Sequence, residues 1–289
     1  KDSIPQDSPL KDSMQNTQQL KLLAVIGNPI KHSLSPLMHN YALQKLGLNS
    51  FYTRFCLPQD MDSSDLADFI LSSDLAGVNV TLPFKETCFR ALDSIQGIAN
   101  EICAVNTIVR KDDKLIGYNT DAEGFYHAIK SHNPKHVLLL GAGGSARSIA
   151  TILFRNNINL TIANRSTEKL AYFSQFGETL SFADLGGKTE CYDIIVNATS
   201  ASVKGVLPMQ EEILIPLLQQ SRLAYDLMYQ AGDTPFCALA KRYTQALDGK
   251  AMLVYQGALA LMYFHDMEIQ DMQFMHIAKL MAESFKVSL

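Results

Sequence analysis

The feature that most constrains the fold is a regular alternation of short apolar segments with amphipathic helical patterns. In chain order the first of these segments are 22–26, a helix after Ser35, 51–55, a helix near 62–71, and 75–80. A strand–helix–strand–helix–strand order predicts a mostly parallel sheet with helices on its faces. Residues 105–110 and 114–118 then alternate on either side of a polar turn, which predicts a hairpin that closes this unit.

A second alternation begins after Pro134 and predicts another α/β unit. Its expected strands are 136–140, 159–163, 192–196 and 223–227, and its expected helices are 146–154, a helix after Thr167, and 210–219. Two long apolar helical patterns, 253–264 and 274–285, follow without further strands, and we expect them to pack back across the first unit. The predicted division places residues 21–123 with 251–289 in the first domain and residues 124–250 in the second.

Composition limits the class of protein. The chain has 289 residues, of which 47% are hydrophobic and 19% charged, and this excludes a disordered chain, a coiled coil and collagen. Residues 1–20 are polar, with two prolines and no apolar core, so they are expected to form a disordered tail rather than a secretory signal. The net charge is −4 without a basic run, which argues against a nucleic acid or an anionic membrane as partner and favours a small-molecule substrate.

Three further features favour a cytoplasmic enzyme without a metal site. The longest apolar stretch, residues 252–264, is interrupted by Gln256 and is shorter than the roughly 20 residues of a membrane-spanning helix. The five cysteines form no CxxC pair, as expected of reduced thiols in the cytoplasm. The seven histidines show no metal-ligand spacing. We expect a monomer or a homodimer.

The turn after the expected strand 136–140 has the spacing of a dinucleotide-binding motif, G-x-G-x-x-A. Its residues are Gly141, Ala142, Gly143, Gly144, Ser145 and Ala146. Gly141 permits the tight turn, Gly143 lets the backbone approach a pyrophosphate, and the small Ala146 lets helix and strand pack closely. An ordinary glycine-rich turn is the alternative. A strand, turn, helix and second strand within about 30 residues favour the dinucleotide site.

The end of the next expected strand indicates which dinucleotide is bound. An enzyme that uses NAD usually has an acidic residue here for the ribose hydroxyls, whereas this chain has Asn164 followed by Arg165 and Ser166. Arg165 can hold a 2′-phosphate with two hydrogen bonds, and Lys169 can add charge from the first turn of the following helix. The pattern predicts NADP as cofactor. The alternative is that Arg165 and Lys169 are solvated surface charges.

Polar residues gather at three places where expected strands end and helices begin, which is where open α/β sheets bind ligands. At the first, Ser33 and Ser35 precede Pro36. A helix cap is one explanation of Ser35, but two hydroxyls at a helix N-terminus also suit a carboxylate. At the second, Pro83 predicts the start of a helix with Lys85 in its first turn, where the helix dipole would lower the pKa of an amine.

At the third place, residues 104–107 and 117–124 bring Asp121 to the start of an expected helix. Asp121 as an N-cap, and Lys85 as a solvated lysine beside Glu86, are the purely structural explanations. Reduction of a carbonyl by a nicotinamide needs a group that delivers a proton, and no metal site is evident. Lys85 with Asp121 is an available acid–base pair.

Nine short strings in this chain resemble the shikimate dehydrogenase family, in the family's order, from about residue 22 to residue 264. They are GNPIKHSLSPLMHN (27–40), GVNVTLPFKE (77–86), AVNT (104–107), GYNTDAEG (117–124), GAGGSA (141–146), NRS (164–166), NATS (197–200), DLMY (226–229) and MLVYQGA (252–258). One such string has little specificity, whereas nine in sequence are highly specific.

The resemblance implies an N-terminal substrate-binding catalytic domain and a Rossmann-type NADP-binding domain. It implies reversible reduction of 3-dehydroshikimate to shikimate with NADPH, a step toward the aromatic amino acids. The implied substrate ligands are Ser33 and Ser35 for the carboxylate, Tyr229 near that end, and Thr81, Asn106 and Gln256 for the ring hydroxyls. Lys85 is the implied proton carrier and Asp121 its partner and a hydroxyl ligand, while Thr199 belongs to the implied cofactor site.

The sequence departs from the family at two points and leaves two rivals open. Two residues after NATS, in the loop on the nicotinamide side, the family commonly has glycine, where this chain has Ser202 and reaches glycine only at Gly205. The chain also has no tryptophan in the helix after Gln256, where the family usually has one. One rival is a quinate or shikimate dehydrogenase that uses NAD. The other is a non-catalytic dinucleotide-binding regulator that has kept the fold.

Overall fold

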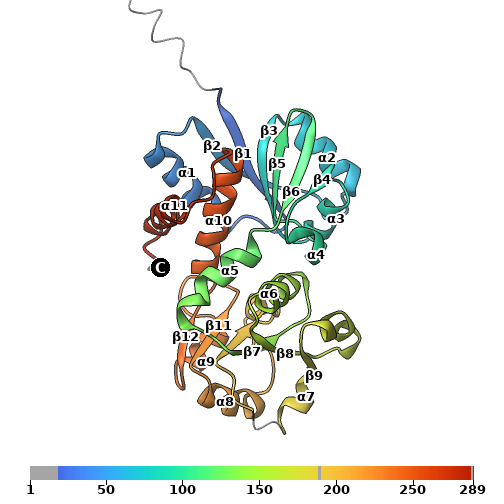
Figure 1. The fold of residues 1–289 in the computed structure, drawn as a ribbon, viewed down its shortest axis with the longest axis vertical. Coiled ribbons are helices and arrows are strands. Elements are labelled where there is room, and N and C mark those ends of the chain that lie inside the picture. The colour runs from blue at the N-terminus through green and yellow to red at the C-terminus, as the bar shows by residue number, and fades with distance from the viewer. Residues whose placement is uncertain (1–18, 188–189, 288) are drawn as a thin grey trace, which may run out of the picture.

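The computed structural model describes residues 19–187, 190–287 and 289, which form two six-stranded sheets arranged along the long axis of the molecule (Figure 1). Strands β1 to β6 form the first sheet and β7 to β12 the second. Almost all of the predicted tail, residues 1–20, lies outside the described residues. The predicted class, α/β with two sheets, is confirmed, while the proposed domain boundaries stay predictions.

The first sheet has the strand order β2-β1-β3-β5-β6-β4. Its strands are β1 (Lys21–Gly27), β2 (Ser50–Cys56), β3 (Leu75–Val80), β4 (Ser94–Ile95), β5 (Thr107–Lys111) and β6 (Lys114–Tyr118). β1 pairs in parallel with β2 and with β3, whereas β5 runs antiparallel to β3 and β6. The expected hairpin is therefore confirmed as β5 and β6, although its first strand begins two residues later than predicted.

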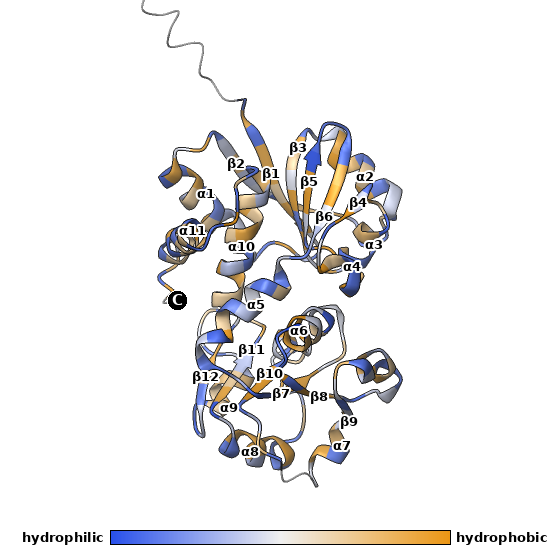
Figure 2. Cartoon of the chain, viewed as in Figure 1, coloured by the Kyte–Doolittle hydropathy of each residue, from blue (hydrophilic) through white to orange (hydrophobic). Residues whose placement is uncertain are grey.

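Helices cover both faces of this sheet (Figures 1 and 2). The helices from this part of the chain are α1 (Ser35–Leu46), α2 (Ser63–Ser72), α3 (Lys85–Phe89) and α4 (Ala99–Ile102). The C-terminal helices α10 (Lys250–Phe264) and α11 (Asp271–Glu283) return to it and pack with α1, as predicted. Because side chains alternate along a strand, Leu23 and Val25 of β1 pack in the core under α10 and α11, whereas Ala24 and Ile26 pack in the core on the opposite face.

The second sheet is parallel throughout, with the order β12-β11-β10-β7-β8-β9. Its strands are β7 (His136–Leu140), β8 (Asn159–Asn164), β9 (Glu178–Ser181), β10 (Ile194–Asn197), β11 (Leu223–Asp226) and β12 (Gln245–Leu247). Its helices are α6 (Gly144–Arg155), α7 (Phe182–Leu185), α8 (Glu211–Gln220) and α9 (Pro235–Ala240), with 3₁₀ segments η3 (Thr167–Gln175) and η4 (Ser202–Lys204). Strand order reverses between β7 and β10, and ligands of such sheets bind at that switch point.

Helix α5 (Asp121–Ile129) leads from the first sheet to the second, followed by the short η2 (Lys130–His132). It packs against both α10 and α6.

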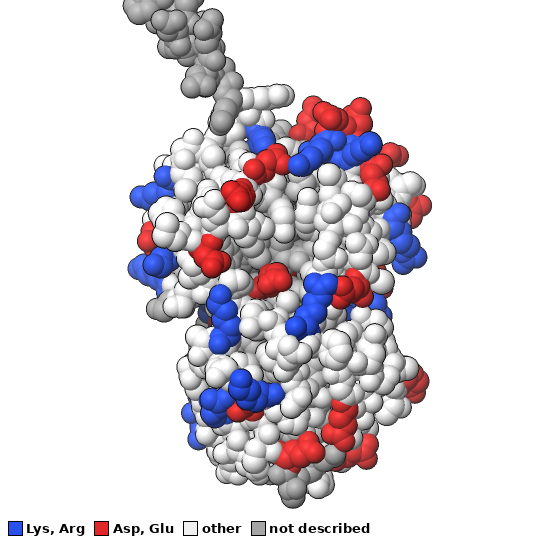
Figure 3. Space-filling view, viewed as in Figure 1, with Lys and Arg blue, Asp and Glu red and all other residues white. Residues whose placement is uncertain are grey.

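Charged side chains of both signs are interspersed over the face in Figure 3. Among the described residues, no helix is long and apolar enough to cross a membrane.

Three details of the helices differ from the sequence-based expectations. The N-cap of α1 is Leu34, so Ser35 is the first helical residue and its side chain makes no cap hydrogen bond. Likewise Thr120 occupies the N-cap of α5, and Asp121 is the first helical residue. The segment after Thr167 is a 3₁₀ helix rather than an α-helix. Neither Ser35 nor Asp121 is therefore explained by helix capping.

His39 gives the fold a specific dependence of stability on pH. Burial, with a smaller effect of His265, lowers the pKa of its imidazole from an ordinary value of 6.5 to about 3. Between these values the unfolded chain binds a proton that the folded chain does not, so stability falls as the pH falls. We expect this residue to lower the free energy of unfolding by up to about 1.4 kcal/mol for each pH unit below about 6.5.

Denaturant unfolding from about pH 8 to about pH 4 checks this expectation. His39→Phe, which keeps a ring but cannot titrate, should flatten the dependence. His276→Gln, which changes an exposed histidine, is the control and should not. An unchanged slope in His39→Phe would show that other groups set the acid sensitivity.

Candidate active site

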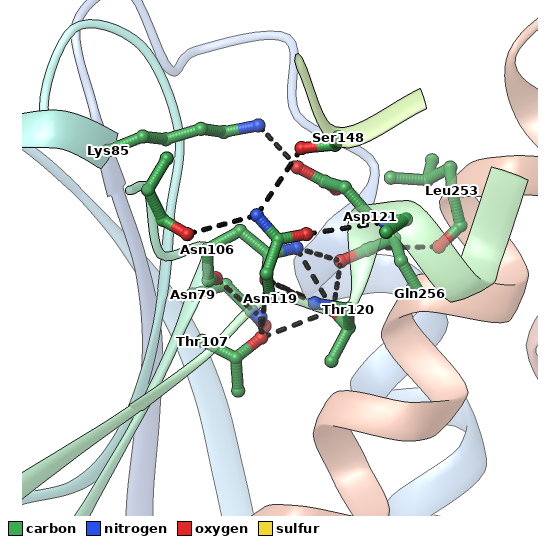
Figure 4. A network of polar contacts seen from close by, with 12 residues as sticks. Asn79, Lys85, Asn106, Thr107, Asn119, Thr120, Asp121, Ser148, Leu253 and Gln256 are labelled. Atoms are coloured by element: carbon green, nitrogen blue, oxygen red, sulfur yellow. Dashed lines mark hydrogen bonds and ion pairs between the residues drawn. The ribbon is translucent and has the colours of Figure 1, made fainter. Parts of the chain in front are cut away.

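Lys85 and Asp121 form an ion pair between the starts of two helices, α3 and α5 (Figure 4). Nζ of Lys85 lies 2.5 Å from Oδ2 of Asp121, and the two side chains keep 17% and 10% of their surface exposed. Pro83 precedes α3 as expected, and Lys85 is its first residue. The structure thus brings the predicted acid–base pair together and leaves it in contact with solvent.

A network of buried hydrogen bonds lies directly beside this pair. Asn106 donates from Nδ2 to Oγ1 of Thr120 at 2.9 Å and accepts at Oδ1 from the backbone N–H of Thr120 at 2.7 Å. The same Nδ2 lies 3.4 Å from Oε1 of Gln256. Since Thr120 immediately precedes Asp121, the predicted ligands Asn106 and Gln256 are held next to the acid–base pair.

A close crossing of α5 and α10 places Gln256 in this network. A Cβ atom added to Gly124 would lie 2.8 Å from both the backbone N and the Cβ of Gln256. Only glycine permits this approach, because real Cβ atoms essentially never make such short contacts. The glycine of the GYNTDAEG string therefore has a packing reason that the sequence did not reveal.

Two further buried polar residues join the network, and the sequence analysis did not single them out. Asn79 of β3 lies opposite Thr107 of β5 in the antiparallel register and donates to its Oγ1 at 3.0 Å. Asn79 also donates to the carbonyl of Asn106 and accepts from the hydroxyl of Tyr52 at 2.7 Å. Asn79 lies within the GVNVTLPFKE string and Thr107 within the AVNT string, but the sequence assigned neither a role.

The serine-bearing loop after β1 lies next to Thr81. A Cβ atom on Gly27 would lie 2.4 Å from Cγ2 of Thr81, and Asn28 donates its backbone N–H to the carbonyl of Leu82 at 2.9 Å. Ser35 in turn donates its backbone N–H to Oγ of Ser33 at 3.3 Å. The three hydroxyl residues predicted to bind substrate are thus carried by neighbouring segments.

Tyr229, which follows β11 in the second sheet, reaches this serine loop. Burial raises the pKa of its phenol, and the nearby backbone of Leu34 lowers it by a smaller amount. The predicted neighbour of the carboxylate end therefore lies near the residue between Ser33 and Ser35, although it comes from the other half of the molecule.

The glycine-rich turn has room for a bound group in front of helix α6. A Cβ atom at Gly143 or Gly144 would meet no atom of the described residues within 4 Å, so the space before these residues is open. The first hydrogen bond of the helix runs from the N–H of Arg147 to the carbonyl of Gly143, and the amides before it point out of the helix end. Ala146 is fully buried against the sheet. These features fit a pyrophosphate.

The end of β8 fits a phosphorylated ribose. Asn164 is the last residue of β8, and its side chain donates to the carbonyl of Ser166 at 2.8 Å. Arg165, Ser166 and Lys169 are exposed, and among the described residues neither cation has an ion-pair partner. Lys169 lies in η3, not in the first turn of an α-helix as expected. Both cations are thus available to an anionic ligand.

Comparisons with known proteins cover both halves of the chain. A model of the shikimate dehydrogenase substrate-binding domain matches residues 25–108, and a shikimate/quinate 5-dehydrogenase model matches residues 126–227. Shikimate dehydrogenase (NADP(+)) of Helicobacter acinonychis is 43% identical over 86% of this chain and 94% of its own. The enzyme of Helicobacter hepaticus is 44% identical over 85% of this chain and 91% of its own. This chain belongs to the shikimate dehydrogenase family.

Solved structures of family members share the arrangement. Shikimate dehydrogenase from Aquifex aeolicus superimposes with a TM-score of 0.80 at 30% identity, covering 93% of this chain and 98% of that one. The Thermus thermophilus enzyme in complex with NADP(H) and shikimate gives a TM-score of 0.76 at 30% identity, covering 90% of this chain and 99% of that one. The predicted family and fold are confirmed, while the roles of individual residues stay predictions.

Ser202, which stands where the family commonly has glycine, makes a buried hydrogen bond in this structure. Ser202 donates to Oδ2 of Asp226 at 2.5 Å, and the same oxygen accepts from Thr234 at 2.7 Å. Asn197 donates to the other carboxylate oxygen and accepts from the hydroxyl of Thr199 at 2.7 Å. The loop after β10 is therefore anchored to β11. A Cβ atom on Gly141, whose φ is +114°, would lie 3.1 Å from the N of Thr199, which places this loop against the glycine-rich turn.

Among the described residues, no group of three or more His, Cys, Asp and Glu side chains could hold a metal ion.

A cavity lies at the amino-terminal ends of β1 and β3, away from the Lys85–Asp121 pair, and is lined by residues that include Lys21, Ser50 and His265. It contains none of the predicted site residues.

The crossing at Gly124 yields a stability prediction. Gly124→Ala should destabilise the protein by about 1–3 kcal/mol, because the added methyl group must push the backbone of α10 away. Gly144→Ala, at the first residue of α6, is the control, since among the described residues a Cβ there meets no atom within 4 Å. Urea unfolding of both variants measures the difference. Equal stability of Gly124→Ala and the wild type would mean that the two helices separate at no cost.

Proposed function

We propose that this protein catalyses the reversible, NADPH-dependent reduction of 3-dehydroshikimate to shikimate. The observation that carries the proposal is the Lys85–Asp121 pair, which lies beside the network of Asn106, Thr120 and Gln256. The names of its relatives, shikimate dehydrogenase (NADP(+)), and the Thermus thermophilus complex with NADP(H) and shikimate support it. The reaction belongs to the biosynthesis of aromatic compounds.

The substrate binds between a carboxylate end and a hydroxyl end. Ser33 and Ser35, with Tyr229 beside them, offer hydroxyls and a helix N-terminus to the carboxylate. Thr81, Asn106 and Gln256 bind the ring hydroxyls, with Asp121 as a further acceptor. In this proposal residues 21–123 and 251–289 hold the substrate, and residues 124–250 hold the cofactor.

The cofactor's phosphates bind along the second sheet. The amides of residues 144–146 hold the pyrophosphate, Arg165 and Lys169 the 2′-phosphate, and Asn164, Ser166 and Thr199 complete the site. When bound, NADPH supplies a hydride to the carbonyl carbon. The chain contributes no carboxylate at the end of β8 that would repel a 2′-phosphate.

Lys85 supplies the proton that completes the reduction. Its ammonium donates a proton to the carbonyl oxygen as the hydride arrives, and this oxygen becomes the hydroxyl of shikimate. Asp121 holds the ammonium in place and stabilises its charge before the transfer. Because Lys85 is partly exposed, it regains a proton from water after each turnover. Oxidation of shikimate follows the same path in reverse.

The proposed ligands are small molecules, shikimate or 3-dehydroshikimate and NADP. We infer from the sequence that the protein is a cytoplasmic enzyme that acts as a monomer or a homodimer. The principal rival within the family is oxidation of quinate with NAD, and rates with shikimate and quinate, each with NADP and NAD, distinguish the two.

Replacement of the acid–base pair tests the mechanism. Lys85→Ala should lower kcat by about 10² to 10⁴-fold, because the reaction loses its proton donor, while NADP binding stays unchanged. Asp121→Asn should be severe as well, and the double variant should lose much less than the product of the two single losses. Steady-state kinetics with shikimate and NADP measure all three. A variant with weaker shikimate binding and normal kcat would make Lys85 a binding residue.

Arg165→Ala tests the choice of cofactor. The loss of one charge-assisted hydrogen bond to the 2′-phosphate should raise the KM for NADP by roughly 10- to 150-fold. The KM for NAD should hardly change, because NAD has no 2′-phosphate. An equal loss with both cofactors would assign Arg165 to the fold instead.

A further inference from the structure

Asn119, in the GYNTDAEG string, is a buried residue that the proposed function does not use. It precedes Thr120 and Asp121, and 6% of its surface is exposed. The side chain of Thr120, which occupies the N-cap of α5, makes no capping hydrogen bond. Instead Oδ1 of Asn119 accepts from the backbone N–H of Ala122 at 3.2 Å. Asn119 therefore satisfies an amide in the first turn of the helix that begins with Asp121.

The nitrogen of the same side chain holds the segment between α4 and β5. Nδ2 of Asn119 donates to the backbone carbonyl of Ala104 at 3.1 Å. The next residue, Val105, donates its backbone N–H to the carbonyl of Lys85 at 3.2 Å. Both residues of this segment are buried. A continuous series of contacts therefore runs from Lys85, the first residue of α3, through this segment and Asn119 to the first turn of α5.

A third contact reaches helix α6, which belongs to the second sheet. The same Nδ2 lies 3.4 Å from Oγ of Ser148, and Ser148 is 2% exposed (Figure 4). The N-terminus of this helix faces the proposed pyrophosphate site. Because an amide nitrogen carries two protons, one is available to Ala104 and one to Ser148. The side chain of Asn119 thus contacts three separate segments of the chain.

The two backbone partners fix the direction of the amide. With its oxygen and nitrogen exchanged, the oxygen would face the carbonyl of Ala104 and the nitrogen would face the N–H of Ala122. Two acceptors and two donors would then oppose each other in a buried site, which costs free energy. Only one orientation of Asn119 therefore satisfies both backbone groups.

We propose that Asn119 is a positioning residue for the acid–base pair, whose amide sets the separation between Lys85 at the start of α3 and Asp121 at the start of α5. This inference rests on the proposed function. Asn119 touches neither substrate nor cofactor and acts through Asp121. Reaction rates depend steeply on such geometry, since a displacement of about 1 Å can cost on the order of 10²-fold. An asparagine that only caps α5 would contribute to stability and leave kcat unchanged.

Asn119→Ser separates positioning from capping. A serine oxygen suits the amide of Ala122, as in other helix caps, but the shorter side chain leaves the carbonyl of Ala104 without its donor. We expect kcat with shikimate and NADP to fall by about 10- to 100-fold, with an unchanged KM for NADP. The Tm should fall less than in Asn119→Ala, which also loses the cap. A wild-type kcat in Asn119→Ser would overturn the inference.

Asn40→Ser is the matched control. Asn40 of α1 is half-buried and makes the same two kinds of hydrogen bond with the backbone of Tyr52, donating to its carbonyl at 2.8 Å and accepting from its N–H at 2.9 Å. It has no part in the proposed site. This control should lower the Tm and leave kcat unchanged. A loss of kcat as large as that of Asn119→Ser would assign both effects to the fold and overturn the inference.

A double-mutant cycle with Asp121→Asn shows through which residue Asn119 acts. The variant with both substitutions should have nearly the kcat of Asp121→Asn alone, because the charge that Asn119 positions is then gone. Losses that multiply would contradict the proposed route through Asp121.

Crystal structures of the wild type and Asn119→Ser separate the two proposals, because they do not depend on turnover. Nζ of Lys85 and Oδ2 of Asp121, 2.5 Å apart here, should lie beyond hydrogen-bond distance in the variant. If the wild type oxidises shikimate and the ion pair is unchanged in the variant, the inference about Asn119 fails and the proposed function stands. If the wild type does not turn over shikimate but the pair separates in the variant, the proposed activity fails and Asn119 still holds the pair.

Discussion

The packing of α5 against α10 is the contact on which the rest of the site depends. These helices are the two places where the chain passes between the sheets, one on the way to the second sheet and one on the return. They meet at Gly124 and Gln256 with no room for a side chain between them. Since α5 begins with Asp121, this one crossing sets the position of the carboxylate of the proposed acid–base pair relative to the amide of Gln256.

Burial gives this arrangement its rigidity. An unpaired polar group in a protein interior costs about 1–3 kcal/mol, so each buried amide and hydroxyl must find its partners. Asn106 uses both its donor and its acceptor on Thr120, and Asn79 bonds both Tyr52 and Thr107. Rotating any one of these side chains would leave at least one buried partner unsatisfied. Such a network holds the proposed substrate ligands Asn106 and Gln256 in one arrangement, which reduces the ordering that binding of a ligand would require.

The sequence predicted the parts of the site that depend on local order along the chain. Lys85, the serine loop and the glycine-rich turn all lie where an apolar strand ends and a helix begins, and this pattern is visible without a structure. Asn79 and Thr107 were missed because their pairing depends on the antiparallel register of β3 and β5, which the strand patterns do not specify. Short elements such as β4, β9 and α7 were missed because two to four residues carry no measurable period.

The capping of Ser35 was misjudged for a related reason. Serine before proline is frequent at the start of a helix. Here, however, Leu34 occupies the cap position and Ser35 is the first helical residue, so the hydroxyl of Ser35 does not cap the helix. The backbone N–H of Ser35 instead hydrogen-bonds Oγ of Ser33 at 3.3 Å. The proposed site residues also differ in burial along their length. Asp121 and Gln256 are buried, with 7% and 8% of their surface exposed, whereas Ser33, Thr81 and Tyr229 are half-buried.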